Sequence, residues 1–269
     1  MAACTIAVMA GVPMSQEQAR TLSASYAHRL RNCVPWSSAM PWAPELNLQA
    51  STYNVRELWP GLAASDAPVD QLEPGQFVDS PGGRFRYCVR LQRRGKPLLT
   101  WWGNQVGTVV FDGNVPIPAL YQAPEDPQDE RPWNEAPWMS LTPAELMTLR
   151  PGTRMAKGHT VIAGLGLGHQ LIEVAKRLPV KRVTVVELDR ELADWIMPVI
   201  EPHIRKKVDV IIGDAYEVIP KLTANVALID IFPGYGDGFR RVEELRRASP
   251  NIKKFWGWGT SEMTGKAQR

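Results

Sequence analysis

The chain has 269 residues, 44% of them hydrophobic, and a formal net charge of +3. Its length allows one well-filled domain with a smaller second one, and so mild a charge does not by itself indicate a nucleic-acid partner. The cysteines Cys4, Cys33 and Cys88 are scattered, and neither they nor the four histidines have metal-ligand spacing. No apolar run is long enough to cross a membrane. We therefore expect a cytoplasmic protein with reduced thiols and no metal.

The first 122 residues predict little regular structure before a small β unit. Helical spacing over 16–30 is followed by loops rich in proline and tryptophan up to about residue 80. Strict alternation over 85–91 predicts a half-buried strand, and two further strands are expected at 97–102 and 106–111. With turns at the intervening glycines, these segments predict a three-stranded meander over 84–112.

A connector and a helix precede the core of the fold. Residues 123–137 are rich in proline and acid, which predicts an exposed linker. Thr142 can cap a helix, Pro143 suits its first position and Glu145 completes a capping box. The Pro151-Gly152 pair is expected to end this helix. From residue 138 to 269 we expect a single nucleotide-binding domain.

The remaining chain alternates strands and helices. Strand segments are expected up to Ala163 and at 182–186, 208–215, 226–233 and 253–258. Helices are expected at 169–178, 191–201, 216–222 and 238–248. Such alternation predicts an α/β fold with a doubly wound, Rossmann-like, mostly parallel sheet. The expected strand order is 3-2-1-4-5, with a ligand at the switch point between strands 1 and 4.

A glycine-rich turn follows the first core strand. Gly164, Gly166 and Gly168 form a G-x-G-x-G pattern; His169 stands where a dinucleotide fingerprint would need its last glycine. Gly164 allows a sharp turn, Gly166 allows a ligand to approach the backbone, and Gly168 lets the helix start close to the sheet. The free N–H groups at the helix N-terminus would then face the ligand.

Acidic residues stand at or near the ends of the next three strands. They are Glu187, Asp214 and Asp230. Each could simply cap a helix or contact water at a strand end, but three in register favour a nucleoside-binding site.

With these motifs, residues from about 138 to 232 resemble the class I S-adenosylmethionine-dependent methyltransferases, and within them the spermidine-synthase-like branch. The resemblance implies that S-adenosylmethionine is the cofactor. It places the methionine part at Gly164, Leu165, Gly166 and Gly168, the ribose at Glu187 beside Leu188, and the adenine at Asp214 and Ala215. It also implies that Asp230 lies near the methionine amino group or the substrate, as the candidate catalytic residue. Trp138, Met139, Phe232, Pro233 and Tyr235 are the candidate acceptor-binding residues.

Three functions remain open at this point. The first is a methyltransferase whose acceptor is unknown, most simply a small molecule, with nucleic acid not excluded. The second is a protein that binds S-adenosylmethionine without transferring its methyl group. The third is a polyamine aminopropyltransferase, which is disfavoured because the acids that such enzymes need are replaced at Leu167 and in the 233–234 region.

The end of the sheet raises the question of oligomeric state. Eleven residues follow Trp258, too few for the last helix and antiparallel strand pair that the resemblance would imply. We therefore expect a truncated fold whose last strand has Trp256 and Trp258 on one face. An uncovered edge of this kind favours a homodimer, unless the first 80 residues fold back over it.

Overall fold

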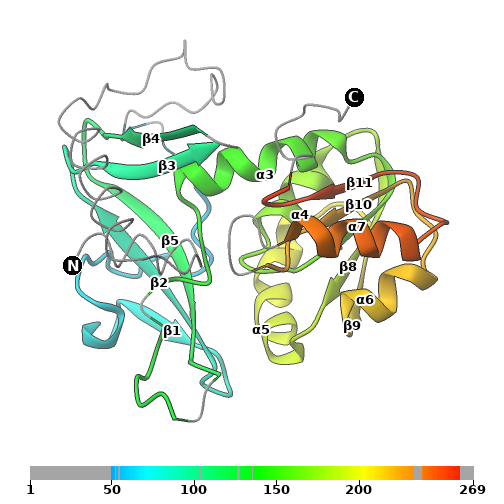
Figure 1. The fold of residues 1–269 in the computed structure, drawn as a ribbon. Helices are drawn as coiled ribbons and strands as arrows, with labels where there is room; N and C mark the ends of the chain where they lie inside the picture. Colours follow the sequence, from blue (N-terminus) through cyan, green and yellow to red (C-terminus); the bar gives the residue numbers. More distant parts are fainter. Residues whose placement is uncertain are drawn as a thin grey trace, which may run out of the picture.

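The computed structural model describes residues 50–51, 53, 55–102, 105–125, 128–134, 136–232 and 238–260. It contains an α/β unit and an antiparallel β unit that lie side by side, with helix α3 (Pro143–Met155) between them (Figure 1). The predicted helix over 16–30, Cys4 and Cys33 lie outside the described residues.

The α/β unit is built on a five-stranded parallel sheet. Its strands are β7 (Gly158–Ala163), β8 (Val180–Glu187), β9 (Val208–Ile212), β10 (Val226–Ile229) and β11 (Phe255–Gly257). They run in the order β11-β10-β7-β8-β9, and every neighbouring pair is parallel. This is the predicted order 3-2-1-4-5, so the Rossmann-like fold class is confirmed.

Helices cover both faces of this sheet because its strands are apolar on both sides. Ile162 and Leu228 face one core, with side chains of α3, α4 (His169–Lys176) and α5 (Arg190–Ile200). Their chain neighbours Val161 and Ala227 face the other core, with α6 (Ala215–Val218) and α7 (Gly238–Ala248). Two 3-10 turns, η2 (Glu201–His203) and η3 (Ile219–Lys221), extend α5 and α6.

The predicted three-stranded meander is wrong. Strand β2 (Phe85–Gln92) pairs with β1 (Phe77–Asp79) and with β5 (Val115–Gln122), which in turn pairs with β6 (Met139–Ser140). The segments β3 (Leu98–Trp102) and β4 (Gln105–Val109) are strands, but they form a separate two-stranded sheet.

The prolines of β5 explain why this strand was missed in the sequence. A proline removes a donor from a strand and normally argues against a central position. Pro116 and Pro118 lie on alternate residues, and the Pro118 carbonyl accepts from Leu141 N (2.9 Å) on the side away from β2. Both prolines therefore lack their N–H groups on the edge of β5 that faces β6, which is only two residues long. The other edge of β5 pairs with β2 along its whole length.

Helix α3 does not end at Pro151 as predicted but continues to Met155. The adjacent Gly152 lets this extended helix pack closely, because a Cβ there would lie 2.5 Å from the Trp256 ring. The helix therefore lies directly on β11, and the indole N–H of Trp258 donates to Thr148 Oγ1 (3.0 Å). Trp256 is fully buried and Trp258 is 8% exposed.

This packing corrects the expectation of an exposed tryptophan edge: the two tryptophans share a face, as predicted, but α3 covers them. The apolar argument for a homodimer therefore fails, while the dimer itself stays a prediction.

Contacts with α5 hold the antiparallel unit in place. Trp59 stacks on Trp195 of α5, with ring centroids 4.8 Å apart. At the start of α5, Glu191 accepts from Ser80 Oγ and from Gly82 N, the latter at 2.7 Å. Arg84 forms an ion pair with Asp189. These bonds place the β1–β2 turn beside the end of β8, where the sequence analysis predicts a ligand.

Candidate functional site

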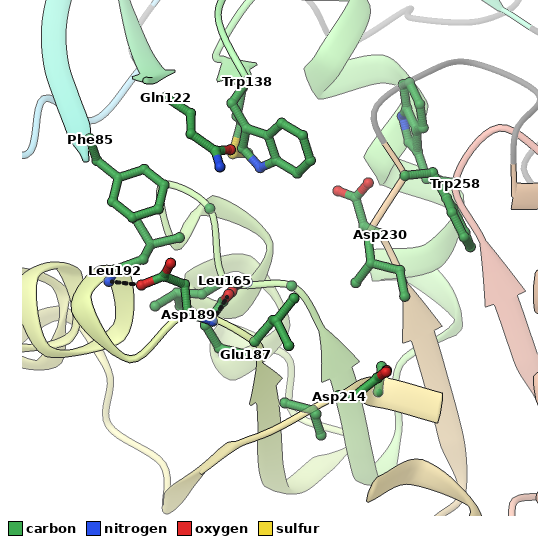
Figure 2. Close-up of a pocket in the computed structure, with 18 of the residues that line it drawn as sticks. Phe85, Gln122, Trp138, Leu165, Glu187, Asp189, Leu192, Asp214, Asp230 and Trp258 are labelled. Carbon is green, nitrogen blue, oxygen red and sulfur yellow. Dashed lines mark hydrogen bonds between the residues drawn. The ribbon is translucent and has the colours of Figure 1, made fainter. Parts of the chain in front are cut away.

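A cavity of about 360 Å³ lies at the carboxyl ends of β7, β8, β9 and β10. This volume lies within the usual range for small-molecule sites, and the position is the switch point of the sheet. Figure 2 shows the cavity between Phe85 and Gln122 of the antiparallel unit and the acids of the α/β unit.

The glycine turn forms the floor of the cavity. Gly164 has a φ of 90°, and a Cβ there would overlap the backbone carbonyl of Asp230. Gly166, with a φ of 51°, also lines the cavity, and a Cβ there would overlap Met139 Sδ. Only glycine fits these two positions, because both the conformation and the space exclude a side chain.

Gly168 has a different place from the one that the resemblance implied. It does not line the cavity, and a Cβ there would overlap Ile200 of α5. Its role in the structure is the close packing of the start of α4 against α5, whereas the glycine spacing predicted a close approach of this helix to the sheet.

Glu187 is the best-defined polar group of the cavity. It ends β8 and is 7% exposed. Its Oε2 accepts from Leu165 N (2.8 Å) and its Oε1 accepts from Asp189 N (2.9 Å), so both ends of the carboxylate are oriented. Burial raises the pKa of this group, and the backbone donors oppose that rise. Each carboxylate oxygen can accept a further bond, so the group can receive a pair of ligand hydroxyls.

The adenine-side candidates line the same cavity. Asp214 is exposed and caps α6, where its Oδ1 accepts from Tyr216 N (2.8 Å). Ala215 is buried behind it, and Leu188 is 73% exposed at the cavity's rim. Asp214 thus has the capping role that the sequence left open as an alternative, while its position at the cavity also leaves it available to a ligand.

Asp230 follows β10 and points into the cavity (Figure 2). Burial raises its pKa to about 7. Glu145 of α3 lines the same cavity, and its pKa is raised well above the usual range by burial and then by the charge of Asp230. The sequence had assigned Glu145 only to a capping box. In the structure its N–H donates to Thr142 Oγ1 (3.3 Å) while its carboxyl group lines the cavity.

The antiparallel unit supplies a wall that the sequence analysis missed. It consists of Arg84, Phe85, Gln122 and Glu125, with Asp189 of the α/β unit paired to Arg84. No motif marks these residues, because their position depends on how β2 and β5 pack beside α5.

Of the predicted acceptor-binding residues, Trp138, Met139 and Phe232 line the cavity, and Trp138 is 46% exposed. Pro233 and Tyr235 lie outside the described residues. Within the described part of the chain, no cluster of histidine, cysteine or acidic residues could hold a metal ion. No helix in that part is long and apolar enough to cross a membrane.

Comparison with solved structures finds methyltransferases that match about two fifths of this chain. One is an S-adenosylmethionine-dependent methyltransferase from Thiobacillus denitrificans in complex with S-adenosyl-L-homocysteine (23% identity, 40% of this chain and 44% of that chain, TM-score 0.32). Another is precorrin-6y C5,15-methyltransferase from Geobacter metallireducens (18% identity, 42% of this chain and 60% of that chain, TM-score 0.33). A third is a dimethyladenosine transferase from Plasmodium falciparum (14% identity, 39% of this chain and 36% of that chain, TM-score 0.32).

The matched part is less than two thirds of each of these chains, and TM-scores this low do not carry an activity from those proteins to this one. Their names give the spermidine-synthase-like branch no support. No protein-family model matches the chain. No curated protein matches it either.

Proposed function

We propose that the protein is an S-adenosylmethionine-dependent methyltransferase. The observation that carries the proposal is Glu187, a buried carboxylate oriented by two backbone N–H groups at the edge of the glycine turn. A carboxylate in this position suits the two adjacent hydroxyls of a ribose. A phosphate would be repelled by it, which favours a nucleoside that carries no phosphate there.

With the ribose assigned to Glu187, the other parts of the cofactor are assigned to neighbouring residues of the cavity. The adenine lies toward Asp214 and Ala215, with Leu188 against its face. The methionine part lies along Gly164, Leu165 and Gly166, where the backbone can be approached closely. Asp230, Trp138 and Phe232 would then line the methyl end of the bound cofactor, which would leave this end of the cavity for the acceptor.

Methyl transfer needs little acid–base apparatus. The acceptor attacks the methyl carbon in line with the carbon–sulfur bond, and the electron pair of that bond stays on sulfur. The protein's contribution is to hold the two reactants in line and to exclude water. The aromatic side chains that line the cavity suit that task.

A pair of matched ligands tests the ribose assignment without depending on the acceptor. The wild-type protein is expected to bind adenosine about tenfold or more tightly than 2′,3′-dideoxyadenosine, because a hydrogen bond to a charged group contributes about 1.5–3 kcal/mol. In Glu187→Ala the two nucleosides are expected to bind almost equally. Competition against labelled S-adenosylhomocysteine measures both ratios.

Two controls accompany this comparison of the two nucleosides. Glu173→Ala removes a half-exposed carboxylate of α4 that pairs with Lys176, and it should leave the wild-type ratio unchanged. Unfolding curves show whether Glu187→Ala keeps its fold after losing two backbone bonds. Equal binding of the two nucleosides by the wild-type protein contradicts the assignment.

A further inference from the structure

Two acidic residues from different elements line the same cavity. Asp230 comes from the end of β10 and Glu145 from the first turn of α3. Burial and then the charge on Asp230 raise the pKa of Glu145. Within the described residues, neither side chain has a hydrogen-bond or ion-pair partner, unlike Glu187 and Asp189 of the same cavity.

The structure holds Glu145 in this position. Thr148, one turn further along α3, accepts from the indole of Trp258, and its own hydroxyl donates back to Ala144 O (2.9 Å). Two turns on from Glu145, Gly152 lies directly against Trp256. The helix is therefore fixed on β11 at two points, and Glu145 is carried on a rigid element.

The surroundings of the pair favour a cation. Aromatic side chains of Trp138, Phe232 and Trp258 line the same cavity. Its ionisable lining consists of six carboxyl groups and one guanidinium: Glu125, Glu145, Glu187, Asp189, Asp214 and Asp230 against Arg84, which is already paired with Asp189. A cation is stabilised both by such a negative field and by the faces of aromatic rings.

One further polar group points to a ligand here. Gln170, near the start of α4, lines the cavity and is 6% exposed. Its Nε2 has no hydrogen-bond partner within the described part of the chain. A buried amide without a partner is costly. Its N–H groups are donors, so it suits an acceptor atom of a bound ligand, such as a carboxylate oxygen, and not an ammonium.

We propose that Glu145 and Asp230 together bind the ammonium group of an amine methyl acceptor, with the aromatic side chains against its apolar body. This inference rests on the proposed function and gives it a substrate class. An alcohol or thiol acceptor would bring no positive charge to lower the raised pKa values of these two carboxyl groups, whereas an ammonium would.

The pair also has a chemical task, because an ammonium has no lone pair with which to attack. One carboxylate takes a proton from the R–NH3⁺ group, and the neutral amine then attacks the methyl carbon of the sulfonium. The nitrogen–carbon bond forms as the carbon–sulfur bond breaks. The products are S-adenosylhomocysteine, the N-methylated ammonium and the proton held by the carboxyl pair.

Three probes of similar shape test the proposal by calorimetry on protein saturated with S-adenosylhomocysteine: benzylamine, benzyltrimethylammonium and benzyl alcohol. Both cations are expected to bind about tenfold or more tightly than the alcohol, as charged contacts of this kind imply. Glu145→Gln keeps the shape of the side chain and should reduce this preference to less than about threefold, and Asp230→Asn should do the same. The control Glu173→Gln should retain it.

Several results overturn the proposal. One is that benzyl alcohol binds as well as benzylamine, and another is that a folded Glu145→Gln retains the cation preference. If Glu145→Gln instead weakens S-adenosylhomocysteine binding and leaves the ranking of the probes unchanged, the pair serves the cofactor's own ammonium group. Failure of S-adenosylhomocysteine to bind the wild-type protein contradicts the proposed function, and the same titrations on the free protein then still decide whether the pair prefers cations.

Discussion

Asp230→Asn is expected to slow methyl transfer by about 100-fold or more, because a positioned general base contributes about 10²- to 10⁴-fold. The substitution keeps the size of the side chain and removes its capacity to take a proton. Asp230 lies beyond the glycine turn from Glu187, so the affinity for S-adenosylmethionine should change only modestly. The rate of S-adenosylhomocysteine release in the presence of the acceptor measures the first effect, and calorimetry measures the second.

The pH dependence of the same variant gives a readout that needs no acceptor. Burial raises the pKa of Asp230 from 3.8 to about 7, so the folded protein keeps a proton that the unfolded chain has already lost. Wild-type stability from this group therefore falls as the pH rises from about 4 to about 7. The charge on Asp230 also raises the pKa of Glu145, so the observed protonation steps belong to the two carboxyl groups together.

Asp230→Asn lacks this titration and should not lose this stability. The free energy of unfolding of the variant, relative to that of the wild-type protein, should therefore rise between about pH 4 and about pH 7 and stay constant at higher pH. Denaturant unfolding at several pH values checks this expectation. A difference in stability that does not vary with pH, together with equal turnover, removes Asp230 from the mechanism.

Gly164→Ala is expected to abolish cofactor binding and to destabilise the fold. The added Cβ would overlap the carbonyl of Asp230, which belongs to the backbone and cannot rotate away. The strand end that carries Asp230 would then have to move. Gly75→Ala is the matched control, because Gly75 has the same φ of 90° but nothing within 4 Å of the added atom.

The control should lose about 1–2 kcal/mol from the unfavourable backbone conformation alone. Gly164→Ala should lose about 1–3 kcal/mol more from the overlap. Chemical denaturation measures both values, and binding of S-adenosylhomocysteine by a folded Gly164→Ala protein would show that the glycine turn is structural only.

The parallel sheet could be predicted from the sequence because its signals are local. Each strand is a short apolar run, and the glycine turn and the acid at the end of β8 fix the switch point. Right-handed crossovers then leave few possible strand orders. The predicted cofactor residues Leu165, Glu187 and Asp214 accordingly line one cavity.

The rest of the site depends on tertiary packing, which the same local signals do not contain. Pro116 and Pro118 argue against a central strand in the sequence, yet β5 pairs fully with β2 because both prolines lack their N–H groups on the opposite edge. Pro151 suggests a helix end, yet Gly152 lets α3 continue across Trp256. Glu145 fits a capping box in the sequence, and only the position of α3 over β10 and β11 brings its carboxyl group to Asp230.

Titration of the wild-type protein with S-adenosylhomocysteine tests the central claim most directly. One molecule per chain is expected to bind, and adenosine should displace it while 2′,3′-dideoxyadenosine should displace it about tenfold less well or worse. Both results follow from a nucleoside held by Glu187 above the glycine turn. A titration that shows no binding of S-adenosylhomocysteine at millimolar concentration would contradict the assignment of this cavity as a methyltransferase site.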